Sequence, residues 1–85
     1  MKTIFLKSIF EDGIVYFQIK QLENPTNDYI YAGLELIFEE EDQTWEIDEY
    51  ELTADDLSEM YEDDFCDIEE NEFREAYKKA ESFLS

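Results

Sequence analysis

A strict alternation of side chains from Tyr29 to Glu39 constrains the fold of this chain more than any other feature. Every second residue is apolar, from Ile30 to Phe38, whereas the intervening positions mix tyrosine, glycine, isoleucine and glutamate. A period of two predicts a β-strand, because an α-helix repeats every 3.6 residues. A single strand is not stable in water, so the pattern requires partner strands and a cover for the apolar face.

Three further segments predict the partner strands: Lys2 to Phe10, Ile14 to Leu22 and Thr44 to Leu52. Residues 11–13, Glu-Asp-Gly, separate the first two segments and are a hairpin signal. The stretch from Asn24 to Asp28 contains the single proline and predicts a loop. With a polar turn over residues 40–43, the sequence predicts a four-stranded antiparallel β-meander.

Helical periodicity begins after Thr53, which has the chemistry of an N-cap. A first apolar stripe contains Leu57, Met60, Tyr61 and Phe65. A second stripe, from Phe73 to Leu84, is out of phase with the first, which predicts a break over residues 66–71. Asp67 and Glu70 in this break resemble a capping box.

The chain is thus expected to form an α+β fold and a single domain of 85 residues. The meander occupies residues 1–52, and one short and one longer C-terminal helix occupy residues 53–85. Both helices are expected to pack on one face of the sheet, because each sheet face or helix stripe that is apolar must be covered.

The charge of the chain is distributed unevenly along the sequence. The net charge is −19, and the window from Glu35 to Glu72 holds nineteen acidic residues and no Lys, Arg or His. Self-repulsion at this density opposes a compact state. Yet the chain is 44% hydrophobic and 16% aromatic, which is typical of a folded domain and not of an acidic disordered tail. We interpret the window as a surface for a basic partner, and expect neither membrane nor direct nucleic-acid binding.

Two arrays within the window carry this interpretation. Pairing Phe38 with Trp45 and Leu36 with Ile47 would place Glu35 opposite an aspartate, and like charges directly opposite are destabilising. On the first helix, a second group of carboxylates lies opposite the apolar stripe with no lysine between them. The predicted partner-binding residues are Glu35, Glu46, Asp48, Glu49, Asp55, Asp56, Glu59, Glu62, Asp63, Asp64, Tyr29 and Tyr31.

Other carboxylates and the tyrosines have structural alternatives. Asp67, Glu69, Glu70 and Glu72 lie where a helix N-terminus favours negative charge, and Glu70 is four residues before Arg74. Residues 39–42 also fit a solvated turn that protects a sheet edge.

Tyr16, Tyr29 and Tyr31 are expected on the sheet face away from the helices. There they either cover a half-exposed sheet or form a contact, including a possible homodimer.

Several functional classes are disfavoured by composition. Histidine is absent, and the single cysteine, Cys66, lies among carboxylates that keep a thiol protonated. Zinc lacks its usual ligands, and the acidic stretch lacks the glycine and spacing of an EF-hand. We therefore expect no catalysis, no metal and no cofactor. A lone cysteine and the lack of a signal-peptide pattern predict a cytoplasmic protein.

By its size, its acidity and the window from Glu35 to Glu72, the chain resembles the small acidic inhibitors of phages and mobile elements that imitate DNA. These include anti-restriction, anti-CRISPR and uracil-DNA glycosylase inhibitors. The resemblance implies that carboxylates occupy the phosphate sites of a nuclease, a CRISPR effector or a DNA-binding protein. Two alternatives stay open: an immunity protein or antitoxin that neutralises a basic toxin, and an acidic interaction module whose charge keeps it in solution.

Overall fold

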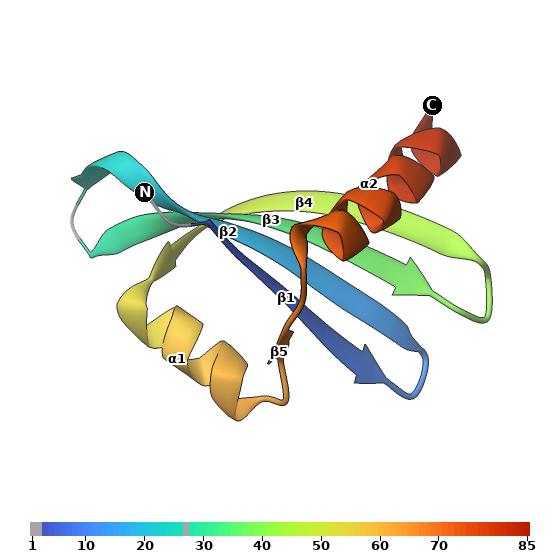
Figure 1. Cartoon of the computed structure of the whole chain (residues 1–85), viewed down its shortest axis with the longest axis horizontal. Helices are drawn as coiled ribbons and strands as arrows, with labels where there is room; N and C mark the ends of the chain where they lie inside the picture. The colour runs from blue at the N-terminus through green and yellow to red at the C-terminus, as the bar shows by residue number, and fades with distance from the viewer. Residues whose placement is uncertain (1–2, 27) are drawn as a thin grey trace.

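The computed structural model describes residues 3–26 and 28–85 and forms one antiparallel sheet with two helices (Figure 1). Its strands run in the order β4-β3-β2-β1-β5. The elements are β1 (Thr3–Phe10), β2 (Gly13–Thr26), β3 (Tyr29–Glu39), β4 (Thr44–Thr53), α1 (Ala54–Glu62), β5 (Cys66–Asp67) and α2 (Glu70–Leu84). The predicted α+β class is confirmed. The sheet has five strands instead of four, because the short β5 pairs with the outer side of β1.

The predicted register of the third and fourth strands is confirmed. Phe38 is paired with Trp45 and Leu36 with Ile47, which places Glu35 opposite Asp48. Alternation fixes this register, since a slip by one residue would move every apolar side chain to the other face.

The predicted loop over residues 24–28 is shorter than expected, because β2 continues to Thr26. Pro25 is tolerated there since the pairing of β2 with β3 is irregular between Gln21 and Thr26, and proline has no N–H for a regular ladder. Two residues of the predicted elements, Lys2 and Asn27, lie outside the described residues.

The hairpin between β1 and β2 also differs in detail from the prediction. Gly13 is already paired with Phe10, so the turn consists of residues 11 and 12. A Cβ atom on Gly13 would collide with the carbonyl oxygen of Phe38 on β3. Glycine is required here by the close approach of two strands.

The two helices lie on opposite faces of the sheet, and the prediction that they share one face is wrong. Leu57 and Met60 of α1 pack against a buried cluster that includes Phe17. Phe73 of α2 belongs to a different cluster with Leu36, whose neighbour on β2 is Tyr16 and not Phe17. Successive strand residues point to opposite faces, so these clusters define an α1 face and an α2 face.

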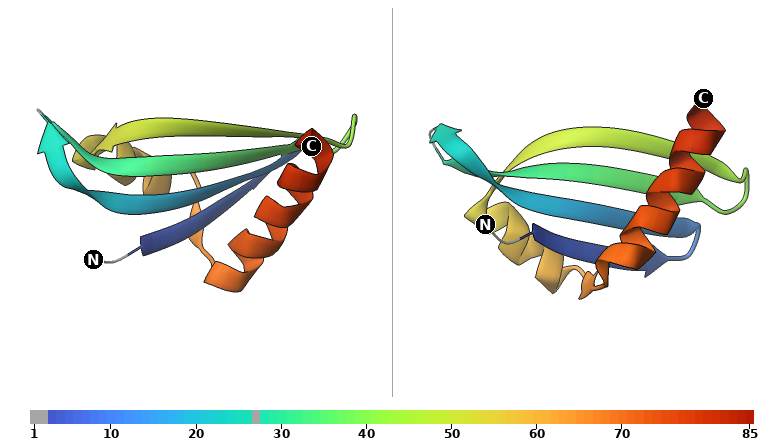
Figure 2. Two further views of the ribbon diagram at one scale, coloured as in Figure 1. Left: turned by 90° about the horizontal axis from the view of Figure 1, so that it is seen from above. Right: turned by 45° about the horizontal axis from the view of Figure 1, so that its top comes forward.

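The chain changes face at β5. After α1 it runs along the outer side of β1, where Leu6 is paired with Asp67 and Lys7 with Cys66, and then enters α2, which crosses the sheet diagonally (Figure 2). The backbone N–H of Ile68 donates to the carbonyl oxygen of Phe5 at 2.9 Å and fixes this crossing. A two-residue strand has too little pattern to be recognised in a sequence.

Helix α1 begins as predicted. The Asp56 N–H donates to Thr53 Oγ1 at 3.1 Å, and the Thr53 N–H donates to Asp56 Oδ2 at 2.9 Å. This reciprocal capping box satisfies two N–H groups that the helix leaves free.

The helix ends before Asp63, and Asp64 adopts a φ of 67°. The chain therefore turns away before Phe65, whose ring packs edge-on against Phe17 from outside the helix.

Helix α2 starts at Glu70 after Glu69, which makes no side-chain capping bond, so the predicted capping box at Asp67 is wrong. Its buried face consists of Phe73, Ala76 and Ala80. The last turn projects past the edge of the sheet at β4 (Figures 1 and 2). Among the described residues, neither helix is long and apolar enough to cross a membrane.

Candidate partner-binding surface

A groove between α1 and the outer strands collects carboxylates from both halves of the chain. It has a volume of about 410 Å³. Five of its ten lining residues are acidic and none is basic. We call this surface the acidic groove; it is lined by Phe17, Tyr29, Glu35, Tyr50, Glu51, Leu52, Asp56, Glu59, Met60 and Asp63.

The helical wall of the acidic groove follows from helix periodicity. Asp56, Glu59 and Asp63 are spaced three and four residues apart, so they lie along one side of α1 and its C-cap. Met60 next to this row reaches the buried cluster and holds the helix to the sheet. The acidic row is thereby fixed at the edge of the contact between helix and sheet.

The sheet wall contains the carboxylate that is most affected by its surroundings. Burial raises the pKa of Glu35 above its ordinary value, a hydrogen bond from the Tyr50 hydroxyl lowers it, and the charges of Asp48 and Glu46 raise it further. The same hydrogen bond is the main reason that the pKa of Tyr50 is raised. The fold therefore holds Glu35 at an electrostatic cost, between an aromatic hydroxyl and two like charges.

The basic side chains of the described residues lie elsewhere. Lys7 on β1 pairs with Glu72 of α2, and this hydrogen bond is the largest cause of the raised pKa of Lys7. Arg74 pairs with Glu70 within α2. No ion pair found among residues 3–26 and 28–85 includes a carboxylate of the acidic groove. These contacts support the structural interpretation of Glu70 and Glu72, which pair at the surface with basic residues of the same chain.

The structure brings five predicted residues into the acidic groove: Glu35, Asp56, Glu59, Asp63 and Tyr29. Of these, Asp56 also has a structural role as the partner of Thr53 in the capping box. Asp55 and Glu62 lie on the exposed side of α1, and Asp64 follows its C-cap.

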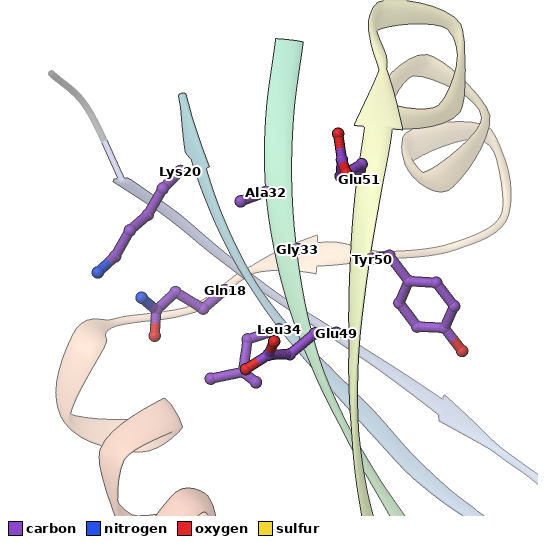
Figure 3. Close-up of a pocket in the computed structure, with 8 residues that line it drawn as sticks. All are labelled: Gln18, Lys20, Ala32, Gly33, Leu34, Glu49, Tyr50 and Glu51. Atoms are coloured by element: carbon purple, nitrogen blue, oxygen red, sulfur yellow. The ribbon is translucent and has the colours of Figure 1, made fainter. Parts of the chain in front are cut away.

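On β4, the strand alternation sends Glu46 and Asp48 to the α1 face and Glu49 to the α2 face. Glu49 lines a second hollow of about 540 Å³ with Lys20, Ala32 and Leu34 (Figure 3). The predicted residues therefore surround β4 on both faces of the sheet and do not form one flat patch.

The expected tyrosine face away from the helices does not exist, because both faces carry a helix. Tyr16 stacks on Trp45 with ring centroids 6.2 Å apart and packs against the α2 cluster. Tyr31 packs against the α1 cluster. Tyr29 is 44% exposed at the acidic groove. Tyr29 keeps its interpretation as a contact residue, whereas Tyr16 and Tyr31 are partly buried and pack against the two core clusters.

The sequence interpretation missed Tyr50 and Glu51. Tyr50 contributes to both hollows, and in Figure 3 its ring points away from Lys20. The signal was present, since Tyr50 continues the alternation of Glu46 and Asp48 along β4.

Among the described residues, no group of three or more Cys, Asp and Glu side chains is placed to hold a metal ion. Cys66 is exposed on β5, with its sulfur 3.9 Å from the carbonyl oxygen of Asp64.

Comparisons with protein-family models, with curated proteins and with solved structures found no match. The geometry and charge of the surface therefore carry the functional argument.

Proposed function

We propose that this protein is a non-enzymatic inhibitor whose carboxylates replace nucleic-acid phosphates in the basic binding site of a nuclease, a CRISPR effector or a DNA-binding protein. The observation that carries the proposal is the acidic groove, which is lined by five carboxylates and by no basic side chain. An exposed surface kept at this cost to stability is explained if a cationic partner neutralises it. We place the protein in the cytoplasm, where such targets act.

The spacing of the carboxylates fits this role. One wall of the acidic groove belongs to α1 and the other to β3 and β4, so carboxylates lie on both sides of the groove. Neighbouring carboxylates of the α1 row lie about 5 to 6 Å apart. Phosphates of a DNA strand repeat on a similar scale, with one charge per about 3.4 Å of axis for each strand.

The aromatic residues favour one alternative, an immunity protein or antitoxin. Tyr29 and Tyr50 lie in the same groove as the carboxylates, and tyrosine is enriched among the residues that dominate binding energy. Such a protein binds one active site with a few acids and aromatics and does not copy DNA. The two functions differ in whether duplex DNA competes with the chain for its partner.

The test uses a captured partner and two charge variants. The chain is immobilised, bound proteins are eluted with duplex DNA at constant ionic strength, and each is assayed for loss of DNA binding or cleavage when the chain is added. One variant replaces Asp55, Glu59, Glu62 and Asp63 by Asn or Gln. The matched control removes the same number of exposed charges through Glu11, Glu23, Glu75 and Glu81.

We expect inhibition to be lost in the first variant and retained in the control. A partner that stays bound in excess DNA supports the antitoxin function. Full inhibition by the first variant, with its fold intact by circular dichroism, contradicts a role for the α1 carboxylates.

A further inference from the structure

The outer edge of β4 is the longest strand edge that the described sheet leaves without a partner. β4 has ten residues and lies at the end of the sheet, whereas β1 at the other side is partly covered by β5. An unpaired edge exposes backbone N–H and C=O groups that a strand from another molecule can pair with.

The side chains of this edge are acidic on both faces. Glu46 and Asp48 point to the α1 face and Glu49 points to the α2 face, whereas Glu51 borders a hollow on each face. All four are exposed, and none of the ion pairs found among the described residues includes them. A second copy of this chain would bring like charges together across the new pair of strands, which is destabilising.

A second observation marks the same edge. The apolar side of α2 begins with Phe73 and Ala80 against the sheet and continues to Phe83 and Leu84 in the turn that projects past β4 (Figures 1 and 2). Phe83 is 48% exposed and Leu84 is 54% exposed. A strand added to β4 would pass beside this turn and cover apolar surface that the domain itself does not cover.

We infer that β4 binds a basic β-strand of the partner as a sixth strand of the sheet. This inference rests on the proposed function, since it takes the partner to be basic, and it adds how the partner is held. Lysine or arginine side chains on both faces of the added strand would meet the four carboxylates of β4. An apolar residue at one end of that strand would contact Phe83 and Leu84. The backbone provides the pairing, and the alternation of side chains provides the selectivity.

The probe is a synthetic peptide of eight residues in which lysine alternates with valine or threonine. Two control peptides have the same net charge: one has N-methyl groups along both backbone edges, so that neither edge can pair with β4, and the other is helical. Amide hydrogen exchange of the labelled chain is followed by NMR. We expect exchange of alternate amides between Glu46 and Leu52 to slow roughly tenfold or more with the alternating peptide only, because only every second N–H points outward.

A pair of variants tests the apolar end of the site. Phe83→Ser is expected to weaken binding of the alternating peptide by at least about threefold, since it removes apolar surface that binding covers. Ile9→Ser is the control, because Ile9 is a similarly exposed apolar residue, 69% exposed, that lies on β1 away from the proposed site. This substitution is expected to leave binding unchanged.

Equal binding of the N-methylated peptide overturns the added strand but leaves the charge-based function standing. If no cationic peptide binds, the result contradicts both the added strand and the charge-based function. Concentration-dependent dimers of the chain alone, with protected β4 amides, would assign the edge to a second copy instead.

Discussion

Glu35→Gln is expected to stabilise the protein near neutral pH. Glu35 lies directly opposite Asp48, and Glu46 is diagonal to it on the same face. Each like-charge pair costs about 0.2 to 1 kcal/mol, so two pairs amount to about 0.4 to 2 kcal/mol. A gain of about 1 kcal/mol raises the Tm of a domain of this size by about 4 to 8 °C. The glutamine side chain keeps an oxygen that can accept the hydrogen bond from the Tyr50 hydroxyl, so the substitution mainly removes the charge.

The pH dependence of this gain has a definite sign. Burial raises the pKa of Glu35 in the folded state above its ordinary value, so between the unfolded and folded pKa values the folded protein binds more protons. The free energy of unfolding therefore falls as pH rises through this interval. Glu35→Gln lacks this decrease, and its advantage over the native chain is largest above the interval.

Urea unfolding followed by circular dichroism measures the effect, with Glu23→Gln as the control. Glu23 is an exposed acid on β2, so an equal gain in both variants would show that total charge, and not the opposed pair, is responsible. Asp48→Asn completes a double-mutant cycle, in which the combined gain should be smaller than the sum of the two. Salt of about 1 M should reduce the gain, since it shortens the screening length to about 3 Å. A destabilised Glu35→Gln at low salt would refute the reasoning.

Three further substitutions test other parts of the structure. Tyr50→Phe removes the hydrogen bond that lowers the pKa of Glu35, so a carboxyl NMR titration should show a higher pKa for that residue; an unchanged pKa would argue against the bond. Thr53→Ala removes the side-chain cap of α1 and should cost about 1 kcal/mol in urea unfolding, whereas Thr53→Ser should cost much less. Phe73→Ala opens a cavity above Leu36, where Phe73 is 2% exposed. It should lower the free energy of unfolding by about 3 to 5 kcal/mol, and a loss below 1 kcal/mol would contradict the assigned core.

The sequence predicted the strands and their register better than it predicted which face of the sheet each helix covers. The alternation in β3 and β4 determines register, because one slip would expose Leu36 and bury charge. The alternation did not predict which sheet face each helix covers, because β2 has large side chains on both faces: Tyr16 points to α2 and Phe17 to α1. When both faces are apolar, periodicity does not tell which helix covers which face.

The acidic groove was predicted by residue type but not by position. Glu35, Glu59 and Asp63 were predicted as partner-binding residues in two separate arrays, and the structure places them around one groove. Tyr31 was misplaced, because an aromatic residue in a strand fits a core and a contact surface equally well until its neighbours are known. Glu49 lines only the second hollow, whereas Glu51 borders both hollows, and the charge pattern alone does not reveal this difference.

The uneven distribution of basic and acidic residues among the elements gives the molecule an electrostatic polarity. Three of the basic residues, Arg74, Lys78 and Lys79, lie on α2, and Lys7 is tied to the same helix through Glu72. Helix α1 and strand β4 carry carboxylates and no basic residue. Such a molecule has a dipole moment in addition to its net charge, so the field of a cationic surface exerts a torque on it before contact. The partner would therefore meet the acidic side first, and fewer encounters would be lost to wrong orientations.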